Sequence, residues 1–238
     1  MSNPETFTEQ YGTSLSVCDY IVAHQLAENR PFSIVDFGAG AGKYGRLVRL
    51  VLGSDIQLTA VEGYPKTARM LQEQKIYNQV EAQLIQDWLA TNSHQYDLAI
   101  FGDVIEHIPA KQIHQVIRSC LPNFKKILIV CPLHEIFQDE AYGNALEIHH
   151  TYLTETFFDS YEIIEKHLIR SGPWLMMNLL IDTQGQKPRG LMRLAQGLFH
   201  LTMLILQPFG AARPLVQFLK KYLLRYKWIL GRSSPSER

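Results

Sequence analysis

Residues 34–45 read Ile-Val-Asp-Phe-Gly-Ala-Gly-Ala-Gly-Lys-Tyr-Gly, and they combine residue types suited to holding a polar ligand. An apolar pair leads into Asp36, three glycines alternate (Gly38, Gly40 and Gly42), and a helical pattern begins at Lys43. This order predicts a buried strand, a tight turn and a helix N-terminus. Glycine tolerates positive φ and lets a ligand lie against the main chain, and a helix N-terminus favours polar or anionic groups. The segment therefore predicts a site for a nucleotide-like cofactor.

The spacing of the glycines indicates which cofactor. A dinucleotide fingerprint has the form G-x-G-x-x-G, and counted from Gly38 its third glycine would fall on Lys43. This chain has G-x-G-x-G instead, with an acidic residue two positions before it. The pattern argues against an NAD(P)-dependent oxidoreductase, which stays an alternative.

Three later apolar segments also end in acidic residues. Residues 56–61 precede Glu62, residues 81–86 precede Asp87-Trp88, and residues 96–101 lead into Gly102-Asp103-Val104-Ile105-Glu106-His107-Ile108. A carboxylate about 20 residues past the glycines, at the end of a second strand, suits the two hydroxyls of a ribose. Together these segments predict one site at the ends of several strands.

In this order and spacing, the four segments resemble the motifs of class I S-adenosylmethionine-dependent methyltransferases over about residues 30–182, and the fourth is similar to the D-V-L-E-H motif of one large subgroup. The resemblance implies S-adenosylmethionine as cofactor. It also implies that Glu62 binds the ribose, that Asp87 and Trp88 contact adenine, and that Asp103 lies beside the methionine moiety. The implied cofactor-binding set is Asp36, Gly38, Ala39, Gly40, Gly42, Glu62, Gly63, Asp87, Trp88, Gly102 and Asp103.

A general base is needed only where the methyl acceptor is a poorly ionised hydroxyl. An imidazole titrates near working pH, and His107 follows the fourth predicted strand, near the sulfonium in related enzymes. His149 and His150 are rival candidates. They end the segment 132–150, which is long for a connection between a strand and a helix and is our candidate for recognising the acceptor. Which histidine acts, or whether any does, stays open.

We expect no metal site. His134, Glu135, His149 and His150 could supply ligands, but no tight ligand spacing supports a metal ion among them.

The alternation of apolar segments and helical patterns predicts an α/β fold, with a doubly wound, mostly parallel, seven-stranded sheet and an antiparallel last strand. Strands are expected at 33–37, 56–61, 81–86, 96–101, 125–131, 161–168 and 174–182. Helices are expected at 11–28, 43–52, 65–75, 88–92, 110–119 and 151–159. The predicted domains are a helical cap at 1–30, a cofactor-binding core at 31–182 and a basic amphipathic helical tail at 183–238.

The net charge of zero conceals an uneven distribution. Residues 187–238 carry ten Lys/Arg and one acidic residue, Glu237, whereas residues 1–186 carry 13 basic and 22 acidic residues. Within the tail, Lys220, Lys221, Arg225 and Lys227 would lie mostly on one side of a helix, opposite bulky apolar residues. This pattern is typical of helices that lie on a membrane surface, although a helical hairpin that packs on the core or on a second subunit would also fit.

The cysteines and the first residues of the chain indicate the cellular compartment in which the protein is found. Three cysteines without metal-ligand spacing indicate a reducing compartment, and the first residues show no secretory signal. We therefore expect a cytoplasmic protein with peripheral contact at the inner face of a membrane through residues 191–230.

The sequence thus predicts an enzyme that transfers a methyl group from S-adenosylmethionine to an oxygen of a small molecule, a lipid or a lipid-linked glycan. No Asn-Pro-Pro-Tyr-like motif, often found in enzymes that methylate nucleic-acid bases, follows the fourth strand, and the tail charges alternate with bulky aliphatic residues. Nucleic acid is therefore not an expected partner. A non-catalytic S-adenosylmethionine-binding module is the main alternative, and the sequence leaves the oligomeric state undetermined.

Overall fold

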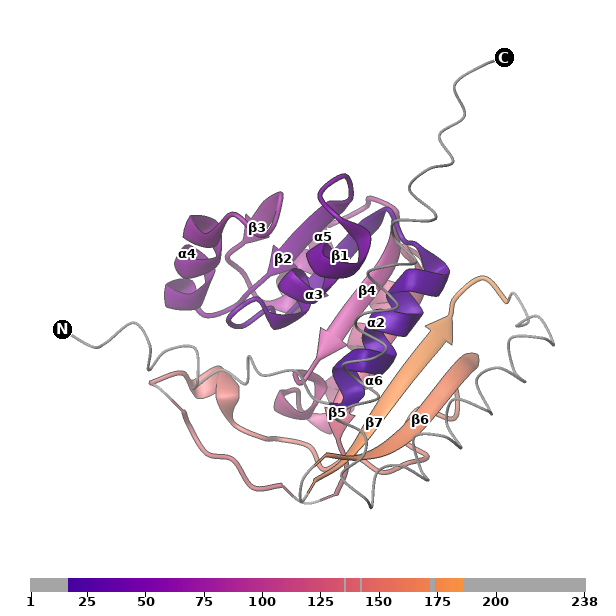
Figure 1. Ribbon diagram of the computed structural model, residues 1–238. Coiled ribbons are helices and arrows are strands. Elements are labelled where there is room, and N and C mark those ends of the chain that lie inside the picture. Colours follow the sequence, from indigo (N-terminus) through magenta and orange to yellow (C-terminus); the bar gives the residue numbers. More distant parts are fainter. Residues whose placement is uncertain (1–16, 135, 142, 172–173, 186–238) are drawn as a thin grey trace, which may run out of the picture. The chain divides into compact units, whose positions relative to one another are not determined.

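The computed structural model describes residues 17–134, 136–141, 143–171 and 174–185. Its centre is a seven-stranded sheet of order β3-β2-β1-β4-β5-β7-β6 (Figure 1). The strands are β1 (Ser33–Phe37), β2 (Gln57–Val61), β3 (Gln79–Glu81), β4 (Tyr96–Gly102), β5 (Phe124–Pro132), β6 (Ile163–Ser171) and β7 (Trp174–Asp182). The helices are α2 (Val17–Asn29), α3 (Lys43–Leu52), α4 (Pro65–Gln74), α5 (Ile85–Thr91) and α6 (Ala110–Cys120), with short 3-10 turns η1 (Ile105–His107) and η2 (Ala145–Glu147).

The first five strands are mutually parallel, whereas β7 runs antiparallel to both β5 and β6. The predicted fold class is thereby confirmed for the described residues. The direction in which successive strands join the sheet reverses beside β1. From β1 the chain adds β2 and β3 on one side, and it then crosses to the other side of β1 to form β4. In open α/β sheets, ligands bind at such a switch point, beyond the carboxyl ends of the strands.

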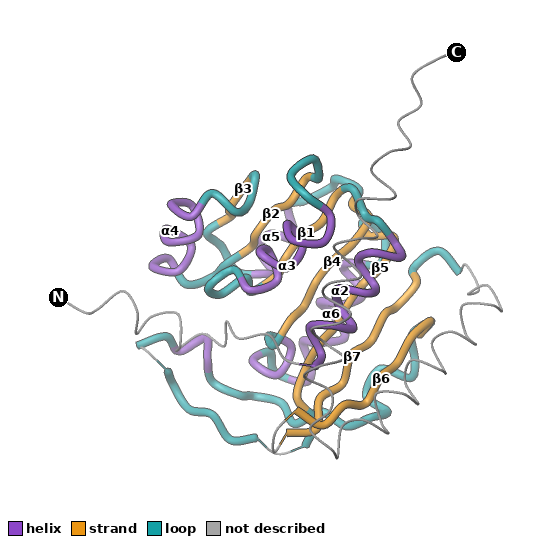
Figure 2. The backbone as a smooth tube through the Cα atoms, viewed as in Figure 1, coloured by secondary structure: helices purple, strands orange, loops and turns teal. Residues whose placement is uncertain are grey.

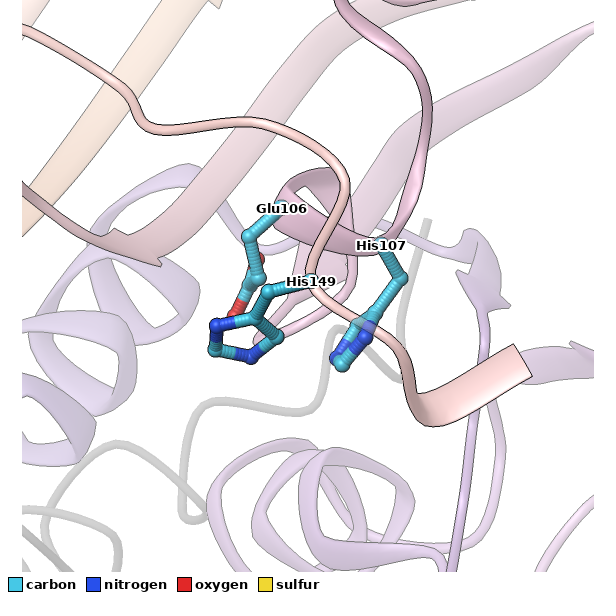
Figure 3. Close-up of side chains that lie close together, drawn as sticks. All are labelled: Glu106, His107 and His149. Carbon is cyan, nitrogen blue, oxygen red and sulfur yellow. The ribbon is translucent and has the colours of Figure 1, made fainter. Parts of the chain in front are cut away.

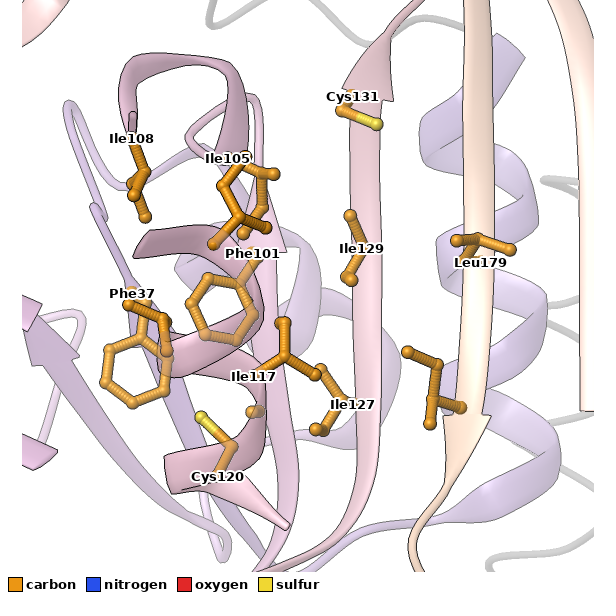
Figure 4. Packing of buried hydrophobic residues seen from close by; sticks show 14 of the residues in the cluster. Phe37, Phe101, Ile105, Ile108, Ile117, Cys120, Ile127, Ile129, Cys131 and Leu179 are labelled. Atoms are coloured by element: carbon orange, nitrogen blue, oxygen red, sulfur yellow. The ribbon is translucent and has the colours of Figure 1, made fainter. Parts of the chain in front are cut away.

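Alternating residues of the strands face two helical layers, as expected where both sides of a sheet are buried. One layer packs α5 and α6 against β1, β4, β5 and β7, and Figure 4 shows Phe37, Phe101, Ile117 and Ile127 within it. On the opposite face, α2 contacts α3, β6 and β7. There the buried Gln25 amide of α2 bonds the Asn178 side chain of β7 and the carboxylate of Glu165.

Two predicted elements are wrong. The strand predicted at 81–86 is β3, which ends at Glu81 because β2, its one neighbour among the described strands, ends at Val61 opposite it. The chain then enters α5 at Ile85, three residues before the predicted helix. The helix predicted at 151–159 is a series of turns instead (Figure 2). Its backbone bonds, such as Phe157 N to Thr154 O and Asp159 N to Thr156 O, span three residues rather than four.

Several predicted features lie outside the described residues. These are the first part of the predicted N-terminal helix (11–16), Glu135 and residues 186–238, which hold most of the predicted tail. Among the residues that the structure does describe, no helix has the length and apolar character needed to cross a membrane.

Candidate functional site

A cavity of about 780 Å³ opens at the carboxyl edge of the sheet, where β1, β2, β4 and β5 end. Its walls combine three segments that are distant in the sequence: the glycine loop after β1, the turn after β4 and the long segment after β5. Ten residues selected from the sequence line it: Gly38, Ala39, Gly40, Glu62, Gly63, Gly102, Asp103, His107, His149 and His150.

The glycine loop presents bare main chain to this cavity. Gly38 has φ +62°, and a Cβ there would lie 2.2 Å from a methyl carbon of Val104, so no side chain fits. Gly40 has φ +52°, but a Cβ there would meet nothing closer than 3.9 Å. Gly38 therefore allows close packing against the turn after β4, and Gly40 leaves open space where a ligand can approach the backbone.

Glu62 at the end of β2 holds the loop in place. Its two carboxylate oxygens accept the backbone N–H groups of Gly40 at 2.9 Å and of Tyr64 at 2.8 Å. The side chain is buried, and burial raises its pKa. A carboxylate has about four lone-pair positions, so these two bonds leave acceptor capacity on a group that lines the cavity.

Asp36 and Gly42 do not line the cavity. Asp36 is buried beneath the loop, where its carboxylate accepts a 2.6 Å hydrogen bond from the Tyr77 hydroxyl. Burial raises the pKa of Asp36 to about 7, and the nearby Glu62 carboxylate adds to the rise. Gly42 is the N-cap of α3, in a left-handed conformation. Both residues support the loop rather than face the open space.

Asp87 and Trp88 are also outside the cavity. They lie in α5, where Asp87 is exposed and Trp88 is buried, its ring packed edge-on against Phe37 at a centroid distance of 5.4 Å. The cavity is lined instead by the residues just before them: Leu84, Ile85 and Gln86. The sequence argument missed these because it placed the end of this strand at residue 86, five residues beyond Glu81.

Asp103 follows β4 in a left-handed backbone conformation, with φ +55°. Its carboxylate lies 3.3 Å from the Nζ of Lys43, which is also 3.1 Å from the buried Asp19 of α2. Lys43, the residue that departs from the dinucleotide fingerprint, thus joins α2 and α3 to the turn after β4. A residue other than glycine at positive φ costs energy, so the surrounding contacts must hold Asp103 in this conformation.

Backbone hydrogen bonds connect the segment after β5 to η1. The N–H groups of His150 and Thr151 both donate to the Glu106 carbonyl oxygen, at 2.9 and 3.0 Å, and the Thr151 hydroxyl donates to the Ile108 carbonyl. Asn144 caps η2 by accepting the Leu146 N–H. These bonds bring His149 beside His107, with ring centroids 4.7 Å apart.

Three titratable side chains meet here: Glu106, His107 and His149 (Figure 3). Burial, and then the adjacent His149, lower the pKa of His107 to about 4. His107 is therefore neutral at physiological pH and a weaker base than a free imidazole. Burial, together with Asp103 and Glu147, raises the pKa of Glu106 well above its usual range. His150 is exposed at the cavity wall.

Glu106 is the principal residue that sequence reasoning missed. It stands inside the quoted motif, next to His107, and that adjacency was the available signal. Of the residues considered for a metal, His134 is exposed and lies apart from this cluster.

No protein-family model matches the sequence, and no match was found among the curated proteins. Several solved structures are similar. TehB from Haemophilus influenzae is 14% identical with a TM-score of 0.54, over 75% of this chain and 66% of TehB. The plantazolicin methyltransferase BpumL in complex with SAH is 14% identical with a TM-score of 0.54, over 76% of this chain and 91% of BpumL. The magnesium protoporphyrin IX methyltransferase ChlM from Synechocystis PCC 6803, with bound SAH, is 13% identical with a TM-score of 0.50, over 69% of this chain and 81% of ChlM. At this identity the similarity establishes a shared fold.

Proposed function

We propose that this protein is an S-adenosylmethionine-dependent methyltransferase. The observation that carries the proposal is the pairing of a bare glycine loop with the Glu62 carboxylate at the edge of a large cavity. Two similar folds hold SAH, the product that remains after S-adenosylmethionine loses its methyl group. The antiparallel β7 also departs from the strand arrangement of dinucleotide-binding sheets.

The residues present fit this cofactor. Glu62 has acceptor capacity left for ribose hydroxyls, and the open space at Gly40 admits a ligand against the backbone. Leu84 and Leu146 add apolar surface beside Gly63, where a purine base would pack, and Ile85 lines the same cavity. When bound, S-adenosylmethionine supplies a methyl group already activated on its sulfonium. The protein's own task is to align the acceptor and to exclude water.

We propose an oxygen of a small molecule, a lipid or a lipid-linked glycan as the methyl acceptor. The part of the cavity lined by the histidines, which we take as the acceptor side, also has apolar walls from Ile136, Trp174 and Met176. Apolar walls with a few polar groups are typical of sites for small organic ligands. The basic tail supports an acceptor at a membrane surface.

Calorimetric titration of the purified chain with S-adenosylmethionine, SAH and NADH tests the cofactor. We expect micromolar binding of the first two and none of NADH. Binding of NADH alone would reject the proposal. Demethylation of S-adenosylmethionine that depends on an added acceptor then separates an enzyme from a non-catalytic binding module, the second candidate function.

Membrane association is tested separately, by co-sedimentation of the full chain with vesicles. We expect binding to vesicles that contain anionic lipid, and weaker binding by the charge-reversed variant Lys220→Glu/Lys221→Glu. Equal sedimentation of the two proteins, or none with anionic vesicles, would reject this part of the proposal.

A further inference from the structure

Glu106, His107 and His149 each offer a ligand atom to the same small volume. These atoms lie within 4.8 Å of one another, and the three side chains meet at the cavity wall (Figure 3). Two of them come from η1 and the third from the segment after β5, 42 positions beyond His107. The cluster therefore depends on the tertiary fold.

Both histidines are already oriented to bind an ion. The Nδ1 of His107 lies 3.2 Å from the Ile148 carbonyl oxygen, and the Nδ1 of His149 lies 2.7 Å from the Ile136 carbonyl oxygen. A carbonyl only accepts, so each Nδ1 carries the hydrogen, and each Nε2 is left with a free lone pair. Histidines that bind metals almost always donate their other ring N–H to a carbonyl or a carboxylate in this way.

Glu106 provides an independent observation. Its side chain is only 3% exposed, and its Oε2 has no hydrogen-bond partner within the described part of the chain. A buried carboxylate oxygen without a partner is costly. The Glu147 carboxylate lines the same cavity, as does that of Asp103, which is paired with the Lys43 ammonium 3.3 Å away.

We propose that Glu106, His107 and His149 bind a divalent transition-metal ion. Two imidazoles and one carboxylate suit zinc, and they also suit iron, manganese or cobalt ions that keep coordination positions free for other ligands. Magnesium and calcium prefer oxygen ligands. Metal bonds of about 2.0–2.2 Å place ligand atoms about 3–4 Å apart, so small side-chain rotations are enough to close the site. Three protein ligands leave positions open towards the cavity.

An ion at this place would face the acceptor side of the cavity. It would bind an acceptor through a hydroxyl oxygen and would favour the ionised form of that oxygen. This role rests on the proposed function, whereas ion binding itself does not.

The test uses the untagged full chain, stripped with a chelator and titrated with Co²⁺, whose visible absorption reports nitrogen and oxygen ligands. We expect one equivalent to bind and Zn²⁺ to displace it. His149→Ala and Glu106→Gln should each weaken binding on the order of 100-fold, since even second-shell losses cost 10- to 100-fold. His94→Ala is the matched control, because His94 is exposed in the loop before β4 and remote from the cluster.

Circular dichroism and thermal melting confirm that each variant folds, and His149→Ala alters only a loop. Absence of Co²⁺ binding by the wild-type chain, or undiminished binding by folded His149→Ala, would overturn the proposal. S-adenosylmethionine titration of the same samples keeps the two proposals apart. Metal binding without cofactor binding rejects only the proposed function, and cofactor binding without metal binding rejects only the metal site.

Discussion

The Glu62 carboxylate accepts the backbone N–H of Gly40 at 2.9 Å, which joins the end of β2 to the glycine loop after β1. The bond spans 22 positions of sequence and sets the loop conformation before any ligand arrives. It also places the acidic group and the open backbone at one end of the same cavity. Substitutions at Gly40 and at Glu62 therefore test separately whether the glycine loop and the carboxylate bind the proposed cofactor.

Gly40→Leu should abolish S-adenosylmethionine binding, because the new side chain would project into open space at the cavity wall. The positive φ adds a stability cost of about 1–2 kcal/mol. Gly185→Leu is the matched control: Gly185 has φ +67°, its Cβ position is also unobstructed, and it does not line the cavity. Calorimetry and thermal melting of both variants check this. Wild-type affinity in Gly40→Leu would contradict the loop's role.

Glu62→Gln should weaken both the fold and cofactor binding. The amide retains one oxygen for two backbone donors, so either Gly40 or Tyr64 loses its acceptor, at a cost of about 1–3 kcal/mol. Replacing a charged acceptor by a neutral one should lower S-adenosylmethionine affinity roughly tenfold. Glu73→Gln, exposed on α4, should change neither quantity. Equal cofactor affinity in the two variants would argue against ribose binding by Glu62.

The sequence predicted the fold, and it also predicted that residues at several strand ends would lie together, because strand ends in a parallel sheet converge. Gly38, Gly40, Glu62 and Asp103 follow three apolar segments, and all four line one cavity. The length of β3 was harder to predict, because β3 extends only as far as β2, its one partner within the described part of the sheet. The convergence of His149 on Glu106 could not be predicted, because it depends on backbone bonds within a segment that has little regular structure.

Because β3 ends at Glu81 rather than at residue 86, Asp87 and Trp88 lie in α5 and not at a strand end. Trp88→Ala should destabilise the protein by about 3–5 kcal/mol, because it removes a buried ring from the core. Asp87→Ala, at an exposed position, should change stability by less than about 0.5 kcal/mol. Urea unfolding followed by circular dichroism measures both.

The S-adenosylmethionine affinity of variants in and next to α5 tests whether Asp87 contacts adenine, as the sequence predicts, or Leu84 does, as the cavity lining indicates. Asp87→Ala should bind S-adenosylmethionine as the wild type does, whereas Leu84→Ala, which shortens a cavity wall, should bind it more weakly. Loss of affinity in Asp87→Ala alone would restore the original assignment of Asp87 to adenine.

Asp36 should make stability depend on pH. Its pKa rises from 3.8 to about 7 on folding, mainly through burial. Between these values the folded protein holds a proton that the unfolded chain has released, so stability falls as pH rises from about 4 to 7. At 1.36 kcal/mol per pKa unit, the loss has an upper limit of about 4 kcal/mol. Asp36→Asn keeps an oxygen for the Tyr77 hydroxyl but cannot titrate, so its stability should fall less over this range.

Urea unfolding at pH 5, 6, 7 and 8 measures this difference, and contributions from titrating groups that do not interact with Asp36 cancel between the two proteins. Tyr77→Phe sharpens the comparison. The Tyr77 hydroxyl bond lowers the pKa of Asp36, so its removal should raise that pKa further and move the fall in stability to higher pH. Parallel pH profiles for wild type and Asp36→Asn would show that Asp36 is ionised in the folded protein throughout. In that case the Glu62 carboxylate would face a second negative charge beneath the glycine loop.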